Sequence, residues 1–387
     1  MIAEVALALV LLVGSGLMLR TVVRVLNTPA GFKPDNVLSM QVQTAGQRFN
    51  DAAVFNQYFD QVLDAVRAVP GVESAAATSQ LPLSGDFDGY GVHIESQPNP
   101  KPETEPSAFR NAVTPGYLET MAIPILRGRS LTAADRADAL PVVVINDALA
   151  RRYWPGKDPL GERIRIGAHD NGPWYTVVGV AGDVRQISLA ATQPFAVYLP
   201  ESQWKFTDGA MSVVMKTRGD PAVVAAAARR AIWSVDRDQP IVRVATMTSL
   251  IGASEAQRSF TLTLITAFAI VALVLAGAGL YGVLSGSVTE RFAEIGVRAA
   301  LGASRANIVT MVLRDGLLLT VTGVVVGAVI AFATTQWMAS MLVGVSAHDP
   351  ITFGAVAVLM IAVAGAASWM PAWRAASVDP ARTLREG

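Results

Sequence analysis

Cysteine is absent from the 387-residue chain, which excludes disulfide scaffolds, cysteine zinc sites and cysteine nucleophiles. Charge is also scarce, because only 16% of the residues are Asp, Glu, Lys or Arg, whereas a soluble globular domain carries about 25%. The 31 basic residues are balanced by 31 acidic ones, so the chain lacks the positive charge typical of nucleic-acid-binding proteins. These absences argue against a wholly cytosolic protein and against nucleic acid as a partner.

Motifs of metal and nucleotide chemistry are missing as well. No H-E-x-x-H, G-x-S-x-G or phosphate-binding G-x-x-x-x-G-K-[ST] occurs. The histidines His93, His169 and His348 lack metal-ligand spacing, and we interpret them as solvated loop residues. Asp86 and Asp88 hint at a cation site, but their spacing is not that of an EF-hand. We therefore expect no enzyme activity, cofactor or metal site in this chain alone.

Long uncharged runs are the dominant feature of the sequence. Each of three runs without Asp, Glu, Lys or Arg exceeds the about 20 apolar residues that cross a bilayer as a helix: 259–289, 316–348 and 350–373. Because no charge opposes insertion, we predict three transmembrane helices. Their expected positions are about 260–285, 316–338 and 351–371.

The N-terminal segment is a further apolar run. Val5–Leu19 is uncharged and mostly aliphatic, and it lies between Glu4 and Arg20. A cleaved signal peptide is the alternative, but the run lacks a positive n-region and a small-x-small cleavage site. We interpret residues 1–26 as a retained first transmembrane helix with a stalk. Glu4 is then expected at the inner interface rather than in a buried proton relay.

Residues 27–257 are different, because they hold all the lysines and only short apolar runs bounded by Pro and Gly. A helix is expected after the N-cap Asp51, a buried strand at Val142–Ile145, and a strand, helix and strand between 211 and 244. The predicted fold is therefore a multi-domain membrane protein. It has four transmembrane helices and a large mixed α/β extracytoplasmic domain inserted between the first and second helices.

Arginines of the short loops set the expected orientation. They lie between the second and third spans and after the fourth: Arg291, Arg298, Arg305 and Arg314, then Arg374, Arg382 and Arg385. The positive-inside rule places this loop and the tail 372–387 in the cytoplasm, and alternation places the insert outside. Arg20, Arg24 and Lys33 oppose this assignment, but the rule is weak beside long translocated domains.

The loop 290–303 has the pattern of a short amphipathic helix. Phe292, Ile295 and Ala299 share one helical face, whereas Glu294 and Arg298 form an i,i+4 pair on the other. Such a helix can dock into a groove of a cytoplasmic partner or lie on the lipid surface. The pattern alone leaves both interpretations open.

Residues 294–303 closely resemble the coupling helix of ABC transporter permeases of the MacB/FtsX type. Segments 342–350 and 371–382 are similar to the outer loop and cytoplasmic tail of that family. Three stretches of the insert resemble the periplasmic core domain of the same family: 128–129, 154–161 and 177–184. The resemblance follows the order derived above, with residues 258–387 as an FtsX-like permease domain.

The resemblance implies a permease subunit of the bacterial inner membrane, driven by a separate cytoplasmic ATPase dimer that binds the ATP. Two permease halves would pair, as a homodimer or within one chain, and pass the motion to their outer domains. This motion would extrude a drug, peptide or lipoprotein-like substrate, and a periplasmic adaptor is a further partner that the family allows. Carried over by residue, the ATPase contact falls on Glu290, Arg291, Phe292, Glu294, Ile295, Arg298, Leu301 and Gly302.

Two other functions stay open at this point, namely an FtsX-like mechanical regulator of a cell-wall hydrolase and a membrane-anchored sensor. The opening segment 5–20 also resembles the middle of the duplicated permeases described in acidobacteria, which implies the second half of such a tandem protein or a descendant of one. Glycines at G-x-x-x-G spacing predict close helix packing, although glycine is common in membrane helices. They are Gly282 with Gly286, and Gly323 with Gly327.

Overall fold

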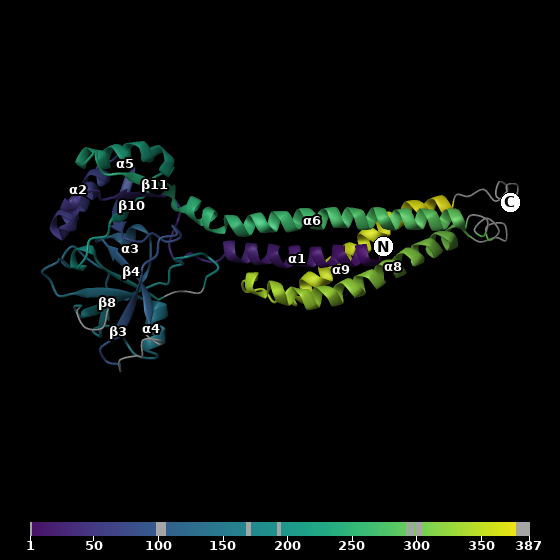
Figure 1. The fold of residues 1–387 in the computed structure, drawn as a ribbon, viewed down its shortest axis with the longest axis horizontal. Helices are drawn as coiled ribbons and strands as arrows, with labels where there is room; N and C mark the ends of the chain where they lie inside the picture. Colours follow the sequence, from purple (N-terminus) through teal and green to yellow (C-terminus); the bar gives the residue numbers. More distant parts are fainter. Residues whose placement is uncertain are drawn as a thin grey trace. The chain divides into compact units, whose positions relative to one another are not determined.

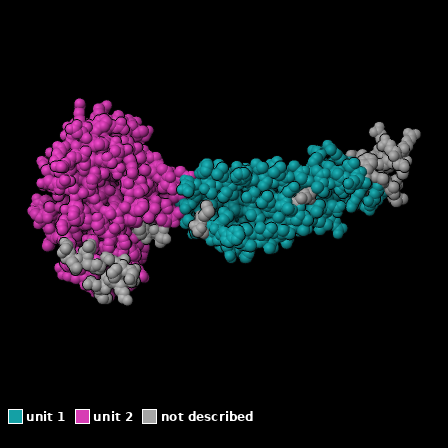
Figure 2. All heavy atoms as spheres, viewed as in Figure 1, with its two compact units in different colours: residues 1–27, 257–387 teal, residues 28–256 magenta. Residues whose placement is uncertain are grey.

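The computed structural model describes residues 2–97, 106–167, 172–191, 195–291, 294, 298 and 304–376. The chain divides into two compact units (Figure 2). Unit 1 comprises residues 1–27 and 257–387, and unit 2 comprises residues 28–256. Unit 2 is therefore the stretch that separates the first apolar helix from the other three.

Among the described residues, four helices are long and apolar enough to cross a membrane (Figure 1). They are α1 (Ile2–Leu26), α6 (Met247–Glu290), α8 (Arg305–Thr334) and α9 (Pro350–Ala376). The predicted number and order of the spans are confirmed. Helix α8 itself stops at Thr334, and a 3-10 helix, η4 (Thr335–Met341), follows it.

Helix α1 is the most enclosed helix of unit 1. Half of the residues in its apolar window are buried, against 28% in α8 and α9 and 11% in α6. Its buried side chains, among them Leu9 and Val13, form a cluster with Ala331 of α8 and Met360 of α9. Helix α6 thus turns most of its apolar surface away from the other described helices.

Unit 2 contains two lobes, and the first is a ferredoxin-like lobe. Its elements in chain order are β1 (Val37–Gln43), α2 (Ala52–Arg67), β2 (Val72–Thr78), β10 (Ala210–Thr217), α5 (Pro221–Val235) and β11 (Ile241–Thr246). The strand order is β11-β1-β10-β2, and all neighbours are antiparallel. Strands β10 and β11 are therefore parallel to each other, and with α5 they form the predicted strand–helix–strand unit. A second such unit, β1-α2-β2, interleaves with it.

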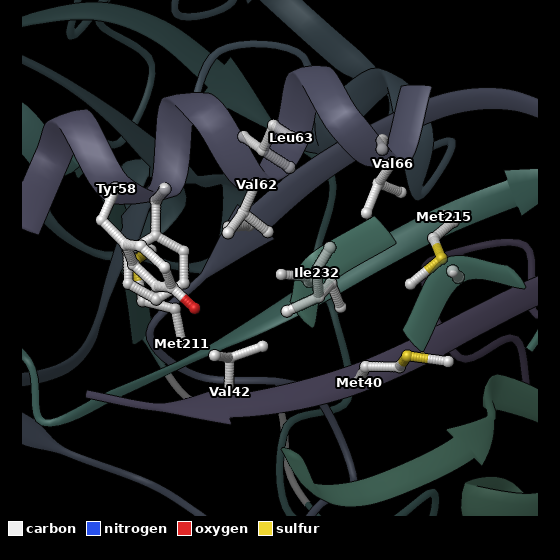
Figure 3. Packing of buried hydrophobic residues seen from close by; sticks show 14 of the residues in the cluster. Met40, Val42, Tyr58, Val62, Leu63, Val66, Met211, Met215 and Ile232 are labelled. Carbon is white, nitrogen blue, oxygen red and sulfur yellow. The ribbon is translucent and has the colours of Figure 1, made fainter. Parts of the chain in front are cut away.

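The core of this lobe lies between its sheet and the helices α2 and α5 (Figure 3). Strand β1 supplies alternate residues, because successive side chains of a strand point to opposite faces. Helix α2 supplies residues at helical spacing, which form its apolar face. The buried set from these two elements is Leu38, Met40, Val42, Phe55, Tyr58, Phe59, Val62, Leu63 and Val66.

Side-chain caps fix the starts of helices α2 and α5. Asp51 accepts the backbone N–H groups of Ala53 and Val54, as the sequence predicts for the start of α2. Asp220 accepts from Ala222 at the start of α5, where Pro221 occupies the first turn. Both caps satisfy donors that have no partner within a helix.

The second lobe is inserted between β2 and β10 of the first. Strand pairings β4-β3-β7-β8-β6-β9, together with β4–β9, close a ring of six strands, and β5 pairs with β8. Its strands are β3 (Gly89–Ile94), β4 (Ser107–Val113), β5 (Ile125–Gly128), β6 (Val142–Asn146), β7 (Arg163–Ile166), β8 (Tyr175–Ala181) and β9 (Phe195–Pro200). The helices are α3 (Tyr117–Thr120), α4 (Asp147–Tyr153) and the 3-10 helix η3 (Glu201–Gln203), while η1 (Gln47–Asn50) belongs to the first lobe.

The histidines differ in their surroundings. His93 lies in β3 and is only 4% exposed, so its interpretation as a solvated loop residue is wrong. The reason is that β3 is paired on both sides, with β4 and β7, within the strand ring. The ring of His348 stacks on that of Phe332 at a centroid distance of 3.8 Å. His169 lies outside the described residues.

Candidate coupling site and its supporting contacts

The predicted coupling segment connects α6 to α8. Helix α6 ends at Glu290, and the N–H of Arg291 still donates to the carbonyl of Ser287 at 3.1 Å. Four of the predicted coupling residues are described, and all four are exposed: Glu290, Arg291, Glu294 and Arg298. The other four, Phe292, Ile295, Leu301 and Gly302, lie outside the described residues.

Arg298 links the segment to α8. Its Nη2 donates to Oε1 of Glu294 at 2.5 Å, so the predicted i,i+4 pair is present. Its Nη1 lies 2.9 Å from the sulfur of Met311 in α8. Arg291 makes a longer ion pair of 3.7 Å with Asp315, also in α8. Because these groups are about half exposed, the pairs add little stability.

Helix α8 begins at a capped and packed end. The hydroxyl of Ser304 accepts the N–H of Asn307 at 3.3 Å and caps the helix. Behind this cap, Ile308 and Val312 form a cluster with Ala372 of α9 and Val288 of α6. The coupling segment is therefore attached to a small core that joins three helices of unit 1.

Two glycines of α8 lie at its contact with α1. A Cβ atom at Gly323 would lie 2.6 Å from Cγ1 of Val5, and one at Gly327 would lie 2.9 Å from Cα of Ala6. A side chain at either position would force the helices apart, as expected for close packing at small residues. At Gly282 and Gly286, by contrast, a Cβ would meet no described atom within 4 Å, so their role in packing stays a prediction.

Two arginines near the end of α1 bind the segment that leads into α9. Arg20 pairs with Asp349, and Nη1 of Arg24 donates to the carbonyl of Gly344 at 2.5 Å. Asp349 also accepts the backbone N–H and the hydroxyl of Thr352 in the first turn of α9. These partners give a local reason for two of the three charges that oppose the positive-inside pattern, Arg20 and Arg24.

Polar groups also join α1 to α6. The hydroxyls of Ser15 and Thr266 lie 2.9 Å apart. A Cβ at Gly279 would lie 2.6 Å from Oε2 of Glu4, so α6 passes closely over this carboxylate. Sequence reasoning missed Ser15, Thr266 and Gly279, because single small or hydroxyl residues in an apolar run give no periodic signal.

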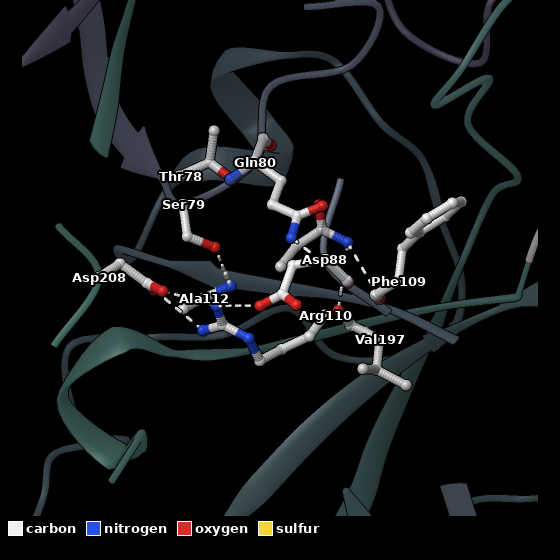
Figure 4. Close-up of polar contacts among 10 residues, drawn as sticks. Thr78, Ser79, Gln80, Asp88, Phe109, Arg110, Ala112, Val197 and Asp208 are labelled. Carbon is white, nitrogen blue, oxygen red and sulfur yellow. Dashed lines mark hydrogen bonds and ion pairs between the residues drawn. The ribbon is translucent and has the colours of Figure 1, made fainter. Parts of the chain in front are cut away.

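Unit 2 carries a buried ion network around Arg110 of β4 (Figure 4). Arg110 is 1% exposed, and its Nη2 donates to Asp208 at 2.6 Å and to Asp88 at 3.0 Å. Its guanidinium carbon also lies 4.6 Å from the ring centroid of Trp204. Burial by itself would lower the pKa of Arg110, but the bonds to Asp208 and Asp88 raise it above its usual value. Arg110 is therefore a paired, permanently charged group inside the lobe.

The same network removes the hint of a cation site at Asp86 and Asp88. Asp88 is bound to Arg110, and Asp86 pairs with Arg243 of β11 at 2.7 Å. Both carboxylates are thus neutralised by arginines, which leaves them poor ligands for a metal ion. In the part of the chain that the structure describes, no group of three His, Asp or Glu residues could hold a metal ion.

Two family models match the chain. A MacB-like periplasmic core domain matches residues 2–233, and an FtsX-like permease C-terminal domain matches residues 266–380. The first match begins in α1 and covers most of unit 2. The second begins within α6 and includes the coupling segment, α8 and α9.

Individual relatives agree with these matches. The macrolide export ATP-binding/permease protein MacB of Marinobacter nauticus is 28% identical over 290 residues, which are 72% of this chain and 43% of that protein. The ABC transporter permease YknZ of Bacillus subtilis is 24% identical over 343 residues, 87% of this chain and 81% of YknZ. This chain thus spans less than half the length of the MacB relative.

One solved structure is also similar. The periplasmic region of MacB from Actinobacillus actinomycetemcomitans matches with a TM-score of 0.39 and 15% identity. The match covers 60% of this chain and 98% of that region. At this score it adds nothing to the assignment made by the family models.

Proposed function

Because the chain belongs to the MacB/FtsX-type family of ABC transporter permeases, we propose that it transmits motion from a separate cytoplasmic ATPase to unit 2. In this proposal the ATPase dimer contacts segment 290–303 and binds the ATP, since the 387 residues contain no G-x-x-x-x-G-K-[ST] sequence. Unit 2 lies outside the bacterial inner membrane, and its displacement does the work on the substrate.

The observation that carries the proposal is the continuity of α6. This helix has 44 residues, which at 1.5 Å per residue corresponds to about 66 Å. The hydrocarbon core of a bilayer is only about 30 Å thick, so α6 is about twice as long as a span requires. It begins within unit 2 and ends at the coupling segment. A movement at one end of an unbroken helix is passed to the other end.

A second route runs through α8 and α1. Arg291 and Arg298 connect the coupling segment to α8, and Gly323 and Gly327 bring α8 against α1. Helix α1 ends at Leu26, and the chain then enters unit 2. One chain connection of unit 2 is thus α6, which is continuous with the coupling segment, and the other is α1, which packs against α8.

The partner of the permease is proposed to be a second copy or a second permease half. Helix α6 supports this, because only 11% of its apolar window is buried within the chain. Gly282 and Gly286 lie on α6 with free space around them, so they offer a place for close approach of another helix. The Marinobacter relative is named as a macrolide exporter, and we propose extrusion of a drug, peptide or lipoprotein-like substrate here too.

The coupling site can be tested with the full chain and its co-purifying ATPase in nanodiscs. We expect Arg298→Ala to lower the ATP hydrolysis that the permease stimulates, because the segment loses its contacts with Glu294 and Met311. Arg230→Ala is the matched control, since Arg230 is exposed on α5 in unit 2. Equal stimulation by the wild type and Arg298→Ala would overturn the assignment of the coupling site.

A further inference from the structure

Three residues form a stripe along the C-terminal half of α1. Because they follow one another at intervals of four residues, they lie on one face of the helix. They are Gly16, Arg20 and Arg24. The stripe contacts the linker 342–349, which precedes α9, and the first turn of α9. Helix α1 ends at Leu26 and the chain then enters unit 2, so the stripe is the last part of α1 before that unit.

The partner of Arg20, Asp349, is fixed to α9. Its Oδ2 accepts the backbone N–H of Thr352 at 2.9 Å and the hydroxyl of Thr352 at 2.6 Å, as an N-cap residue does. Its backbone carbonyl accepts the N–H of Phe353 at 3.2 Å. Because both its side chain and its backbone are bonded to the first turn, Asp349 moves together with α9. The ion pair between Arg20 and Asp349 therefore links α1 to the whole of α9.

Gly16 and Arg20 resist opposite movements of the two helices. A Cβ atom at Gly16 would lie 2.8 Å from Cγ2 of Thr352, so α1 and α9 already approach as closely as a glycine permits. This contact resists any further approach. Separation of the helices, in contrast, would stretch the ion pair of Arg20 with Asp349. The C-terminal end of α1 is thus tied to α9 in both directions.

The linker 342–349 is also attached to α8. The ring of His348 stacks on that of Phe332, and its Nε2 lies 3.0 Å from the carbonyl oxygen of Phe332. Leu342 and Val345 pack against the apolar cluster that α1, α8 and α9 share. The linker therefore contacts three of the four long apolar helices, and α1 is the one among them that continues into unit 2.

Stability gives little reason for the ion pair. The side chain of Arg20 is 44% exposed, and ion pairs at such positions contribute little to the free energy of unfolding. The positive-inside rule gives no reason either for arginines at this end of α1. What the pair supplies is a fixed distance between α9 and the helix that leads into unit 2.

We propose that Arg20 and Asp349 form a joint that makes the C-terminal end of α1 follow α9, so that movement of the apolar helices is passed into unit 2. Arg20 is a positioning residue, because it acts through α1 and not on a substrate. The inference rests on the proposed function, in which unit 2 is displaced during the ATP cycle. It adds the pair of residues through which the displacement reaches α1.

The test measures the displacement of unit 2 in the full chain with its co-purifying ATPase in nanodiscs. Because the chain has no cysteine, spin labels can be attached at Val223→Cys in unit 2 and Trp337→Cys in η4, where the native side chains are 79% and 84% exposed. Labelled chains are mixed with an excess of unlabelled chains, so that pulsed electron paramagnetic resonance reports distances within one chain. The distance is compared without nucleotide and with ADP and vanadate. We expect a nucleotide-dependent shift that Arg20→Gln reduces about twofold or more.

Further variants separate this joint from a merely structural role. Asp349→Asn keeps a side chain that can cap α9 but loses the charge. It should reduce the shift as much as Arg20→Gln does, and the double variant should be no worse than either single one. Arg20→Lys keeps the charge and should retain the shift. Arg136→Gln is the matched control, because Arg136 forms an exposed ion pair with Asp138 in unit 2, close to it in the chain.

The outcomes distinguish this inference from the proposed function. Equal shifts in Arg20→Gln and Arg136→Gln would overturn the joint and leave the proposed function standing, because unit 2 would still move. Additive losses in the double variant would also overturn the joint, since the two residues would then act separately. A labelled chain without any nucleotide-dependent shift would overturn both.

Discussion

Units 1 and 2 both bury apolar side chains, but they are held together differently. Unit 2 has cores of large side chains, in which Phe55 and Phe59 are each 1% exposed, and a buried ion network around Arg110. In unit 1 the contact between α1 and α8 is made at Gly323 and Gly327. The solvent explains the difference, because lipid tails are as apolar as leucine and give helices no hydrophobic reason to associate.

Because of this difference, unit 2 should be destabilised by substitutions that remove side-chain atoms, and unit 1 by substitutions that add them. Unit 2 is stabilised by large side chains that fill its cores and exclude water, so removing atoms from these side chains should lower its stability. Unit 1 depends on close approach, so adding atoms at a glycine should be costly there. The two units also differ in their use of charge, since the ion network of unit 2 surrounds a wholly buried arginine.

The largest effect is expected for Phe55→Ala in unit 2. Deleting this buried ring from the core of the first lobe should lower the free energy of unfolding by about 3–5 kcal/mol. To measure this loss, the full chain in nanodiscs is unfolded with denaturant, and the unfolded fraction of unit 2 is detected by its cleavage with a protease. Val54→Ala, one residue earlier and 37% exposed, should change stability by less than about 0.5 kcal/mol. Similar losses in the two variants would show that this core does not stabilise unit 2.

A smaller effect is expected for Gly327→Val in unit 1. The added side chain would strike the backbone of Ala6 and should destabilise the α1–α8 contact by about 1–3 kcal/mol. Gly354→Val makes the same chemical change on the exposed face of α9, where a Cβ meets no described atom within 4 Å. Thermal inactivation of the purified chains compares them. If Gly354→Val were the more damaging, close approach at α8 would not be what holds unit 1 together.

The smallest effect concerns an ion pair of unit 2. Asp135 is bound by Arg129 through two hydrogen bonds of 2.7 and 2.8 Å. The bonds from Arg129 are the main cause that lowers the pKa of Asp135, and Thr132 contributes as well. Because the pKa of Asp135 is lower in the folded chain than in the unfolded chain, the ion pair stabilises the fold fully at pH values above the unfolded pKa of about 3.9. This stabilisation is lost as the pH falls through the lower pKa of the folded chain.

We therefore expect wild-type unit 2 to lose about 1 kcal/mol more stability than Asp135→Asn between pH 5 and pH 2. Unfolding of the full chain at a series of pH values measures this difference. Parallel curves for the two chains would show that the ion pair adds nothing to the stability of unit 2.

The sequence predicts much of unit 1 and of the ferredoxin-like lobe, because their signals are local. Charge-free runs mark the spans, and helical spacing with the cap Asp51 marks α2. The start of α6 at Met247 is not predicted, since the helix continues outside the apolar run and polar residues carry no span signal. Of the coupling segment, the sequence predicts the pair Glu294–Arg298 but not the contact with Met311, which lies 13 residues away from Arg298.

The second lobe of unit 2 is much less predictable. Strand β4 reads Ser-Ala-Phe-Arg-Asn-Ala-Val, which is not an apolar run, and its Arg110 has the signature of a solvated charge. What buries Arg110 is Asp208, 98 residues further along the chain. Pairings of β4 with β9 are of similar range.

The most direct test of the account is the side of the membrane on which each unit lies. The chain has no cysteine, so single cysteines can be labelled with a membrane-impermeant thiol reagent without a background. We expect Arg230→Cys in unit 2 to be labelled in intact spheroplasts, and Glu294→Cys in the coupling segment to be labelled only after permeabilisation. Labelling of Glu294→Cys in intact spheroplasts, with protection of Arg230→Cys, would contradict the proposal that a cytoplasmic ATPase drives an outer domain.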